Sequence, residues 1–301
     1  MAVSQQLLET IREGYDADAS RSFSIHADCY RDPQIMKLEQ DQIFRRSWQF
    51  LCHEEKLRVP GSYVAADVQG QSIVACRGSD GELRAFYNVC KHRGHELLKG
   101  EGHTRAIVCP YHAWTYGLDG RLKRARRSGH IQNFDTSKVC LTGVQIEVFC
   151  NLVFVNLDPA AAPLAKQSGD LADVIMGYAP DLDKLTFAHR LTYDIQANWK
   201  AVVDNFLECY HCPVSHRDFC TLVDMNSYKV TTHGIYSSHM ADAGQGANSA
   251  YPVDEATVRT HAVWWLWPNT CLMRYPGRGN MIVMHVIPAG PERTLETYDF
   301  Y

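Results

Sequence analysis

The sequence has no long hydrophobic run near its start and no excess of positive charge. Residues 1–13 mix charged and apolar side chains, which predicts a short amphipathic helix and neither a secretory signal nor a membrane anchor. The formal net charge of −4 gives no reason to expect a nucleic-acid partner. Glycine- or proline-rich linkers, internal repeats and low-complexity tracts are also missing. With 301 residues, 46% of them hydrophobic, the chain is long enough for two cores, and we expect a cytoplasmic protein.

A regular disulfide framework is missing as well. The chain has 11 cysteines, an odd number, and their spacing follows no framework pattern. Such cysteines are more typical of reduced thiols and metal ligands than of disulfide bridges. We therefore expect some of them to bind metal.

Two of the cysteines lie beside histidines in a pattern that is typical of a mixed-ligand metal centre. Cys90-Lys91-His92 is followed, further along the chain, by Cys109-Pro110-Tyr111-His112. In a Rieske [2Fe–2S] centre two thiolates bind one iron and two imidazoles bind the other, which raises the reduction potential above that of an all-cysteine cluster. The motifs predict such an electron-relaying cluster, with the ligands Cys90, His92, Cys109 and His112. A tetrahedral zinc site with the same four ligands is the alternative.

The residues around these motifs favour tight loops on hairpins. Arg93-Gly94 gives the backbone room to turn over a cluster, and Gly117-Leu118-Asp119-Gly120 predicts a hairpin turn. Respiratory Rieske proteins carry one further cysteine in each cluster loop, and these two pair as a disulfide. His95 and Tyr111 stand at those places in this sequence, so the centre resembles the soluble, oxygenase type.

A second group of metal-binding side chains lies within residues 198–216. We predict a helix from Trp199 to Cys212 that presents Glu208 and His211 on one face, because they are three residues apart. Pro213 should end this helix and let His216 return toward His211. Two such histidines supply two members of a 2-His-1-carboxylate triad, which leaves positions open on ferrous iron. A zinc site that includes the neighbouring cysteines, or a pair of plain buried thiols, is the alternative.

Together the two motifs resemble the oxygenase component of Rieske non-haem iron oxygenases in order and spacing, from about Phe44 to the last residue. In that family an acidic residue hydrogen-bonds the first iron histidine and a cluster histidine of the neighbouring subunit. The resemblance gives this role to Glu208, with His211 and His112 as partners, and it places Asn205 near the iron. The alternatives are a surface glutamate and a buried asparagine satisfied by backbone. The family also implies a homotrimer, and a separate flavin and iron–sulfur reductase that passes on electrons from NAD(P)H.

Details of the motifs indicate which subgroup of the family the sequence resembles. Position 208 holds glutamate, where many aromatic-ring dioxygenases have aspartate. The motifs look most like those of carnitine monooxygenases and their relatives that act on glycine betaine, choline and stachydrine. This implies an O2-dependent monooxygenase that hydroxylates a carbon next to a quaternary nitrogen, so that carnitine would yield trimethylamine and an aldehyde. Trp264, Trp265 and Trp267 could bind the ammonium group through cation–π contacts or could belong to the core.

Two rival functions fit parts of the pattern. An aromatic-ring-hydroxylating dioxygenase uses the same metals but incorporates both oxygen atoms of O2, whereas a monooxygenase incorporates one. A non-catalytic Rieske electron-transfer protein or a zinc-binding protein would consume no O2. The substrate is not identified, because we expect the pocket to lie in the weakly patterned residues 221–284. Four further histidines are expected to be structural or exposed: His233, His239, His261 and His285.

The sequence predicts an α+β chain with three segments. We expect an N-terminal helix and lead-in in residues 1–42, an all-β Rieske domain in residues 43–160 and a mononuclear iron catalytic domain in residues 161–301. Local patterns predict a hairpin turn at residues 78–81, returning strands in residues 144–157, a helix near residues 171–178 and strands from Val263 onward.

The resemblance implies that the catalytic domain is an antiparallel sheet gripped around a helix, as in START-like folds, with the N-terminal helix packed on it. In the family the carboxylate iron ligand comes from a helix that follows the last strands. Residues 295–301 alternate like a strand, so we expect the sequence to be incomplete at its C-terminus. Asp299 is not assigned as the ligand.

Overall fold

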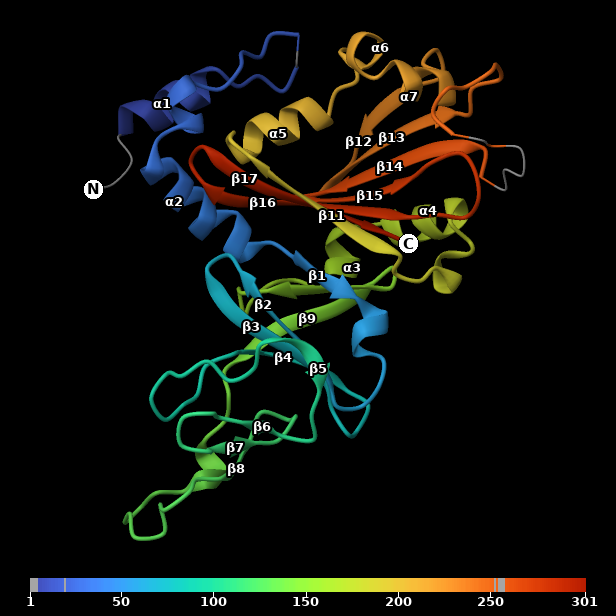
Figure 1. The fold of residues 1–301 in the computed structure, drawn as a ribbon. Coiled ribbons are helices and arrows are strands. Elements are labelled where there is room, and N and C mark those ends of the chain that lie inside the picture. Colours follow the sequence, from blue (N-terminus) through green and yellow to red (C-terminus); the bar gives the residue numbers. More distant parts are fainter. Residues whose placement is uncertain (1–4, 19, 252, 254–257) are drawn as a thin grey trace. The chain divides into compact units, whose positions relative to one another are not determined.

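The computed structural model describes residues 5–18, 20–251, 253 and 258–301. The chain forms two compact units (Figure 1). One unit is Arg45–Gln167, and the other combines the residues before it, up to Phe44, with Ser168–Tyr301. No helix within the described ranges is long and apolar enough to cross a membrane.

The regular secondary structure of the unit Arg45–Gln167 consists mainly of antiparallel strands. Its larger sheet has seven strands in the order β1-β10-β9-β4-β3-β2-β5, and its smaller sheet has the order β6-β7-β8. The strands are β1 (Gln49–His53), β2 (Ser62–Val68), β3 (Gln71–Arg77), β4 (Leu83–Tyr87), β5 (Gly100–His103), β6 (Ile107–Val108), β7 (Thr115–Tyr116), β8 (Leu122–Arg124), β9 (Gly143–Phe149) and β10 (Leu152–Asn156), and a short helix α3 (Leu164–Gln167) follows them. The predicted hairpin at residues 78–81 and the returning strands of residues 144–157 are confirmed.

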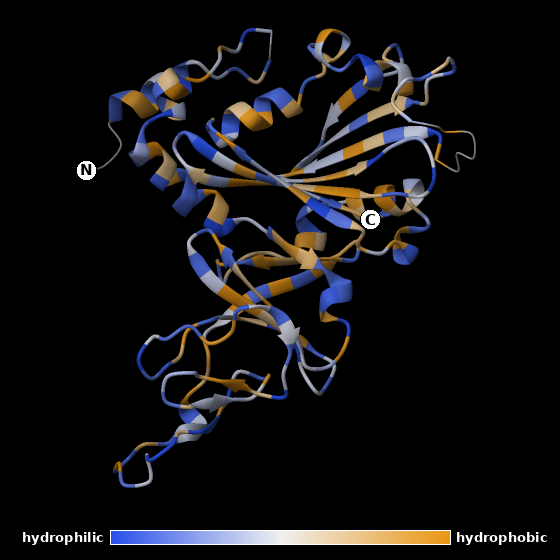
Figure 2. Ribbon diagram, viewed as in Figure 1, coloured by the Kyte–Doolittle hydropathy of each residue, from blue (hydrophilic) through white to orange (hydrophobic). Residues whose placement is uncertain are grey.

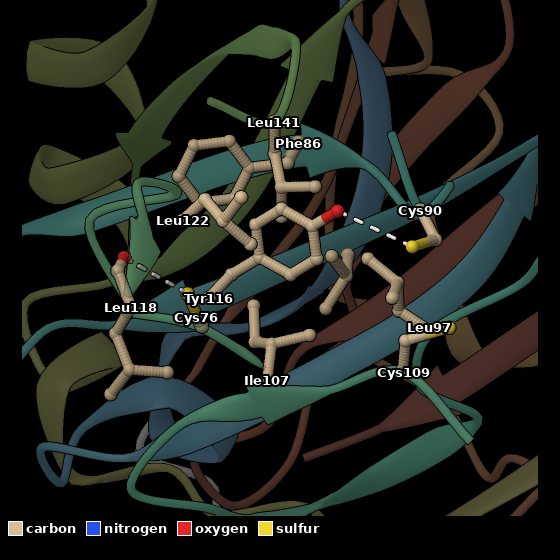
Figure 3. Close-up of a cluster of buried hydrophobic side chains, with 11 residues drawn as sticks. Cys76, Phe86, Cys90, Leu97, Ile107, Cys109, Tyr116, Leu118, Leu122 and Leu141 are labelled. Carbon is tan, nitrogen blue, oxygen red and sulfur yellow. Dashed lines mark hydrogen bonds between the residues drawn. The ribbon is translucent and has the colours of Figure 1, made fainter. Parts of the chain in front are cut away.

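Two apolar clusters fill this unit. One lies within the larger sheet and includes Leu57, Ile73 and Val153, which have no exposed surface. The other surrounds Tyr116 at the smaller sheet and reaches the two cysteines of the predicted cluster loops (Figure 3). Burial of apolar area is the main stabilising contribution to such a core, so the cysteine-bearing loops are anchored on packed side chains.

The second unit contains one antiparallel sheet of seven strands in the order β11-β17-β16-β15-β14-β13-β12. The strands are β11 (His189–Ile195), β12 (Lys229–Thr232), β13 (Tyr236–Asp242), β14 (Thr260–Leu266), β15 (Thr270–Arg274), β16 (Ile282–Gly290) and β17 (Arg293–Phe300). The helices are α1 (Gln5–Glu13), α2 (Pro33–Gln42), α4 (Leu171–Tyr178), α5 (Trp199–Phe206), α6 (Cys212–Ser215) and α7 (Arg217–Leu222). Helix α4 and the strands after Val263 were predicted. The edge strand β11 was not, although Leu191, Tyr193 and Ile195 alternate with polar residues as on a strand.

Helix α5 packs across one face of this sheet (Figure 1). Trp199 and Val203 of the helix belong to one buried cluster with Trp265 and Met284 of the sheet, and Phe44 meets Trp199 edge to face at 4.9 Å between ring centroids. Hydrophobic and hydrophilic residues alternate along α5 in Figure 2, as expected for a helix with one face on a sheet. One all-β unit and one unit in which a helix packs on an antiparallel sheet confirm the predicted fold class.

The three tryptophans considered for cation–π binding belong to the core or its edge. Strand alternation sends Trp264 to the face opposite Trp265, where its ring lies 6.0 Å from that of Tyr178 in α4. Trp265 is buried beneath α5. Trp267 packs against Trp199 at 6.4 Å. None of them lines either of the two cavities near the site, so the ammonium-binding interpretation of these residues is wrong.

Candidate metal centres and substrate cavities

The two predicted cluster loops share one backbone turn. The N–H of Gly94 donates to the carbonyl of Cys90 at 2.9 Å, and the N–H of Ala113 donates to the carbonyl of Cys109 at 3.0 Å. The residue four positions after each cysteine has a positive φ, 69° at Gly94 and 57° at Ala113. The sequence indicated the first turn through its glycine. It gave no sign of the second, because a non-glycine residue rarely adopts this conformation.

The four predicted cluster ligands come together with the sulfurs inside and the imidazoles outside. Cys90 and Cys109 are each 3% exposed, and both belong to the buried cluster around Tyr116. His92 and His112 are exposed, with 4.7 Å between their ring centroids. The donor set fits a [2Fe–2S] cluster whose thiolate-bound iron lies inside and whose histidine-bound iron faces the surface.

Tyr116 connects the cluster loops to the apolar core (Figure 3). Its Oη lies 3.3 Å from the Sγ of Cys90 and accepts the backbone N–H of Lys91 at 3.0 Å. The Lys91 N–H uses one lone pair of the phenol oxygen, so the phenol O–H can donate to the Cys90 sulfur. Burial raises the pKa of Tyr116, so the phenol stays protonated at neutral pH. No metal-binding motif in the sequence includes Tyr116.

Aromatic rings surround the two histidines. His92 stacks on Trp114 at 4.8 Å, and Tyr111 packs on His112 at 3.8 Å. The rings of His95 and Tyr111 are 5.9 Å apart, so the residues that replace the disulfide cysteines of respiratory Rieske proteins face each other.

The segment around the second predicted centre differs from the prediction. Helix α5 ends at Phe206 instead of Cys212, so Glu208 and His211 lie in an irregular turn. Pro213 stands in the first turn of α6 and starts a helix instead of ending one. The reason is that a proline in a first helical turn needs no hydrogen-bonded N–H. His216 is then placed by the end of α6, where its N–H donates to the carbonyl of Cys212.

The cysteines of this turn also contradict the prediction. Cys209 and Cys212 form a disulfide, although the sequence led us to expect reduced thiols. With both sulfurs in a disulfide, the alternatives of a zinc-bound thiolate pair and of two plain thiols are wrong for this turn. Cys90 and Cys109, by contrast, are in no disulfide.

The turn nevertheless brings the predicted side chains together. A carboxylate oxygen of Glu208 contacts Nδ1 of His211, and the other accepts the backbone N–H of Tyr210. The His211 contact lowers the pKa of Glu208, so this side chain is a carboxylate. The rings of His211 and His216 are 5.1 Å apart, and with Nδ1 of His211 bound to Glu208, its Nε2 is left for a metal. This geometry fits an iron with two histidine ligands.

A cavity of about 540 Å³ opens at this turn. Asn205, Glu208, His211 and His216 all line it. Asn205 is exposed, so the alternative of a buried asparagine is wrong. Within the described residues, no group of three or more His, Cys, Asp and Glu side chains is arranged to hold one metal ion.

Two histidines expected to be structural or exposed line the same cavity. His239 of β13 accepts or donates a hydrogen bond with the Tyr228 hydroxyl at 3.1 Å. His261 of β14 is 2% exposed, and its Nδ1 has no hydrogen-bond partner. Burial lowers the pKa of both, for His261 to about 3. A histidine expected on a buried strand is hard to assign from sequence, because only the tertiary fold shows whether it faces a cavity.

A larger cavity of about 930 Å³ lies beside β11 and β17. Tyr193, Glu296 and Tyr298 line it, and the Tyr193 and Tyr298 rings meet edge to face at 5.8 Å. Tyr275 borders both cavities. Burial raises the pKa of Glu296. The expected pocket region, residues 221–284, therefore supplies only part of the walls.

Asp299 points away from these cavities. It follows Tyr298 on β17, so alternation sends it to the other face of the sheet. There its side chain is 3% exposed and pairs with both Nε and Nη2 of Arg190. An aspartate paired in this way is not available to the iron site, which agrees with leaving it unassigned.

Comparisons with known proteins agree with this geometry. Residues 47–135 match the model of the Rieske [2Fe-2S] domain. Residues 182–301 match that of the ring hydroxylating alpha subunit (catalytic domain). The two matches together imply a Rieske cluster and a mononuclear iron, and the first favours a [2Fe–2S] cluster over the zinc alternative.

Individual relatives extend over most of the chain. The carnitine monooxygenase oxygenase subunit of Escherichia coli (strain K12) is 38% identical over 96% of this chain and 77% of its own length. Two solved structures of a quaternary ammonium Rieske monooxygenase, one with the substrate L-carnitine and one with the substrate γ-butyrobetaine, are 36% identical. Their TM-scores are 0.81 and 0.79, and they match 91% of this chain and 74% and 73% of theirs. The chain therefore belongs to the family of oxygen-incorporating Rieske non-haem iron monooxygenases that includes the oxygenase subunit of carnitine monooxygenase.

Proposed function

We propose that this protein is the oxygenase component of a two-component monooxygenase that hydroxylates a carbon next to a quaternary nitrogen and so cleaves the C–N bond. The observation that carries the proposal is the pairing of two donor sets, buried cysteines with exposed histidines in one unit and a carboxylate-oriented histidine pair in the other. An electron relay and an open iron site are the two parts that reductive use of O2 requires.

The donor sets support an assignment of ligands. Cys90 and Cys109 would hold one iron of the cluster, and His92 and His112 would hold the other. His211 and His216 would hold ferrous iron, which when bound supplies the one-electron chemistry with O2. Asn205, at the rim of the same cavity, offers an amide that can orient a bound water or substrate.

Glu208 is the positioning residue of the iron site. Its contact with Nδ1 fixes the tautomer of His211 and directs Nε2 toward the metal. Its side chain is 46% exposed, which leaves it accessible to a second protein surface. We expect it to bond His112 of the partner subunit in a homotrimer, and we expect a flavin and iron–sulfur reductase to supply NAD(P)H electrons in the cytoplasm.

The larger cavity suits a quaternary ammonium group. The faces of tyrosine rings attract a trimethylammonium group through cation–π contacts, and Tyr193, Tyr275 and Tyr298 all line this cavity. Glu296 adds a carboxyl group, which favours a cation over a neutral aromatic ring. The tyrosine rings and the Glu296 carboxyl group together support a quaternary amine over an aromatic hydrocarbon as the substrate.

Turnover under 18O2 tests the proposal. The protein is supplied with reductase, NADH and L-carnitine, and the products are analysed by mass spectrometry. We expect trimethylamine, and an aldehyde that carries one labelled oxygen atom. Two labelled atoms in a ring diol from an aromatic substrate would instead establish the dioxygenase, and no O2 consumption with any substrate would establish a non-catalytic protein.

Metal content tests the donor sets independently of turnover. Iron, zinc and acid-labile sulfide are measured on anaerobically purified protein, together with the EPR spectrum of the reduced state. We expect iron beyond the two atoms of the cluster, with a Rieske signal. Zinc in place of iron would contradict both donor-set assignments.

A further inference from the structure

The 540 Å³ cavity has a polar wall that the metal sites do not use. His239 in β13 pairs with Val263 in β14, and His261 lies two residues before Val263. Cross-strand partners and alternate residues share a face of the sheet, so both histidines lie on the face that packs against α5. Tyr228 completes the wall through its hydroxyl bond to His239.

His261 is the unsatisfied member of this wall. Its ring is enclosed by those of Phe219, Tyr228 and Tyr275, at 5.1, 6.1 and 4.9 Å between centroids. It is 2% exposed, yet its Nδ1 has no hydrogen-bond partner among the described residues. Leaving a buried polar group unpaired costs roughly 1–3 kcal/mol. A group that enters the cavity and pairs with His261 would remove this cost.

The wall is polar but uncharged. Burial lowers the pKa of His239 and of His261, to about 3 for the latter, and raises the pKa of Tyr228 to about 12. All three side chains are therefore neutral near pH 7. A neutral imidazole has one donor and one acceptor nitrogen. That pattern matches a hydroxyl group, which also donates and accepts, better than it matches a carboxylate or an ammonium group.

We infer that His261 is a specificity-determining residue that hydrogen-bonds a hydroxyl group on the substrate. The inference rests on the proposed function and deepens it. The substrate class becomes quaternary amines with a hydroxyl on the chain that carries the reacting carbon. The ammonium end lies against the tyrosines of the larger cavity, and Tyr275, which borders both cavities, connects the two parts of the pocket.

Equilibrium binding to the purified protein, without reductase or turnover, tests the inference. L-Carnitine and γ-butyrobetaine differ by one hydroxyl group, so isothermal titration calorimetry with both isolates its contribution. His261→Leu and His261→Asn form a matched pair, because the two side chains have nearly the same shape and only asparagine keeps a polar group near the Nδ1 position. Phe219→Leu changes the same wall without removing a polar group.

We expect the wild type to bind L-carnitine more tightly than γ-butyrobetaine. His261→Leu should weaken L-carnitine binding roughly two- to tenfold, the effect of one neutral hydrogen bond, and leave γ-butyrobetaine binding unchanged. His261→Asn should retain most of the preference for L-carnitine, and Phe219→Leu should affect both ligands alike. Thermal unfolding and iron content identify any variant that fails to fold.

The outcomes separate this inference from the proposed function. If the wild type binds both ligands with equal affinity, or if His261→Leu weakens both equally, the hydroxyl contact is overturned while the quaternary-amine function stands. The wild-type comparison decides the point even if the leucine variant does not fold. If the wild type binds neither ligand, the proposed substrate class and this inference are both overturned.

Discussion

The two metal centres of this protein are held in different ways. In Arg45–Gln167 the cluster ligands stand on two loops with the same turn, and the cysteines are part of a packed core. In the other unit, His211 and His216 flank the short helix α6, and one carboxylate contact and one disulfide fix the turn before this helix. The cluster site is therefore set mainly by local backbone and core packing, and the iron site by individual side-chain contacts.

The difference determines how each site should respond to mutation. A change at one cluster ligand alters the charge donated to iron, while the packed core keeps the two loops in place. A change at Glu208 alters the side-chain contact that orients His211. We therefore expect shifts in reduction potential from the first site and losses in rate from the second.

The largest effect is expected from His92→Cys. A thiolate donates more charge to iron than a neutral imidazole does, so the reduction potential of the cluster should fall by roughly 200 mV or more while the cluster remains bound. Redox titration followed by EPR measures the midpoint potential. An unchanged potential would show that His92 is not a ligand.

Glu208→Gln should produce the next largest effect. The amide can still contact His211 but loses the negative charge, so cluster and iron should remain bound while cluster-to-iron electron transfer slows by about 10- to 100-fold. Single-turnover kinetics with the pre-reduced protein measures this rate. Asp204→Asn is the matched control, because Asp204 lies one turn earlier and bonds the Tyr30 hydroxyl instead of a histidine. Equal rates for wild type and E208Q would refute the role of Glu208.

The same difference explains how much the sequence could predict. The cysteine and histidine spacing was enough to predict which four side chains come together, because two short loops on hairpins leave them few other arrangements. At the iron site the residues were predicted but the backbone was not. The three-residue spacing of Glu208 and His211 suggested a helix, whereas a turn closed by the Cys209–Cys212 disulfide brings the two side chains together.

The cavity walls were the least predictable part. Leu191 and Tyr193 lie on β11, an edge strand without alternating burial that pairs with β17 more than a hundred residues later. His261 sits on a strand of continuous burial, where a sequence pattern cannot separate a core residue from one that faces a cavity. Pairings between distant strands decide both cases, and no local spacing carries that information.

A smaller effect on the cluster site should come from Tyr116→Phe. Loss of the hydroxyl removes a hydrogen bond to the Cys90 sulfur, and a sulfur without it donates more charge to iron. The midpoint potential should fall by an amount on the order of tens of millivolts. Tyr111→Phe is the control, because Tyr111 packs on His112 through its ring, whereas the Cys90 sulfur has the Tyr116 hydroxyl as its partner. An equal shift in both variants would assign the effect to general packing.

The smallest effect is expected at Glu296, and it concerns stability. Burial raises the pKa of this carboxyl group in the folded protein above its value in the unfolded chain. Its contribution to stability is therefore complete below the unfolded pKa and is lost as the pH rises through the folded pKa. Glu296→Gln stays neutral at every pH, so it should stabilise the fold at pH 7.5 by about 1 kcal/mol and have little effect at pH 4.

Urea unfolding at the two pH values measures this difference, with Glu292→Gln in the exposed turn before β17 as the control. A stabilisation that is the same at both pH values would show that the gain comes from packing instead of charge. If E296Q is less stable than the wild type at pH 7.5, the carboxylate is stabilised in the fold. The ionised Glu296 would then stabilise its unit, as the packing of the cysteines stabilises the other unit.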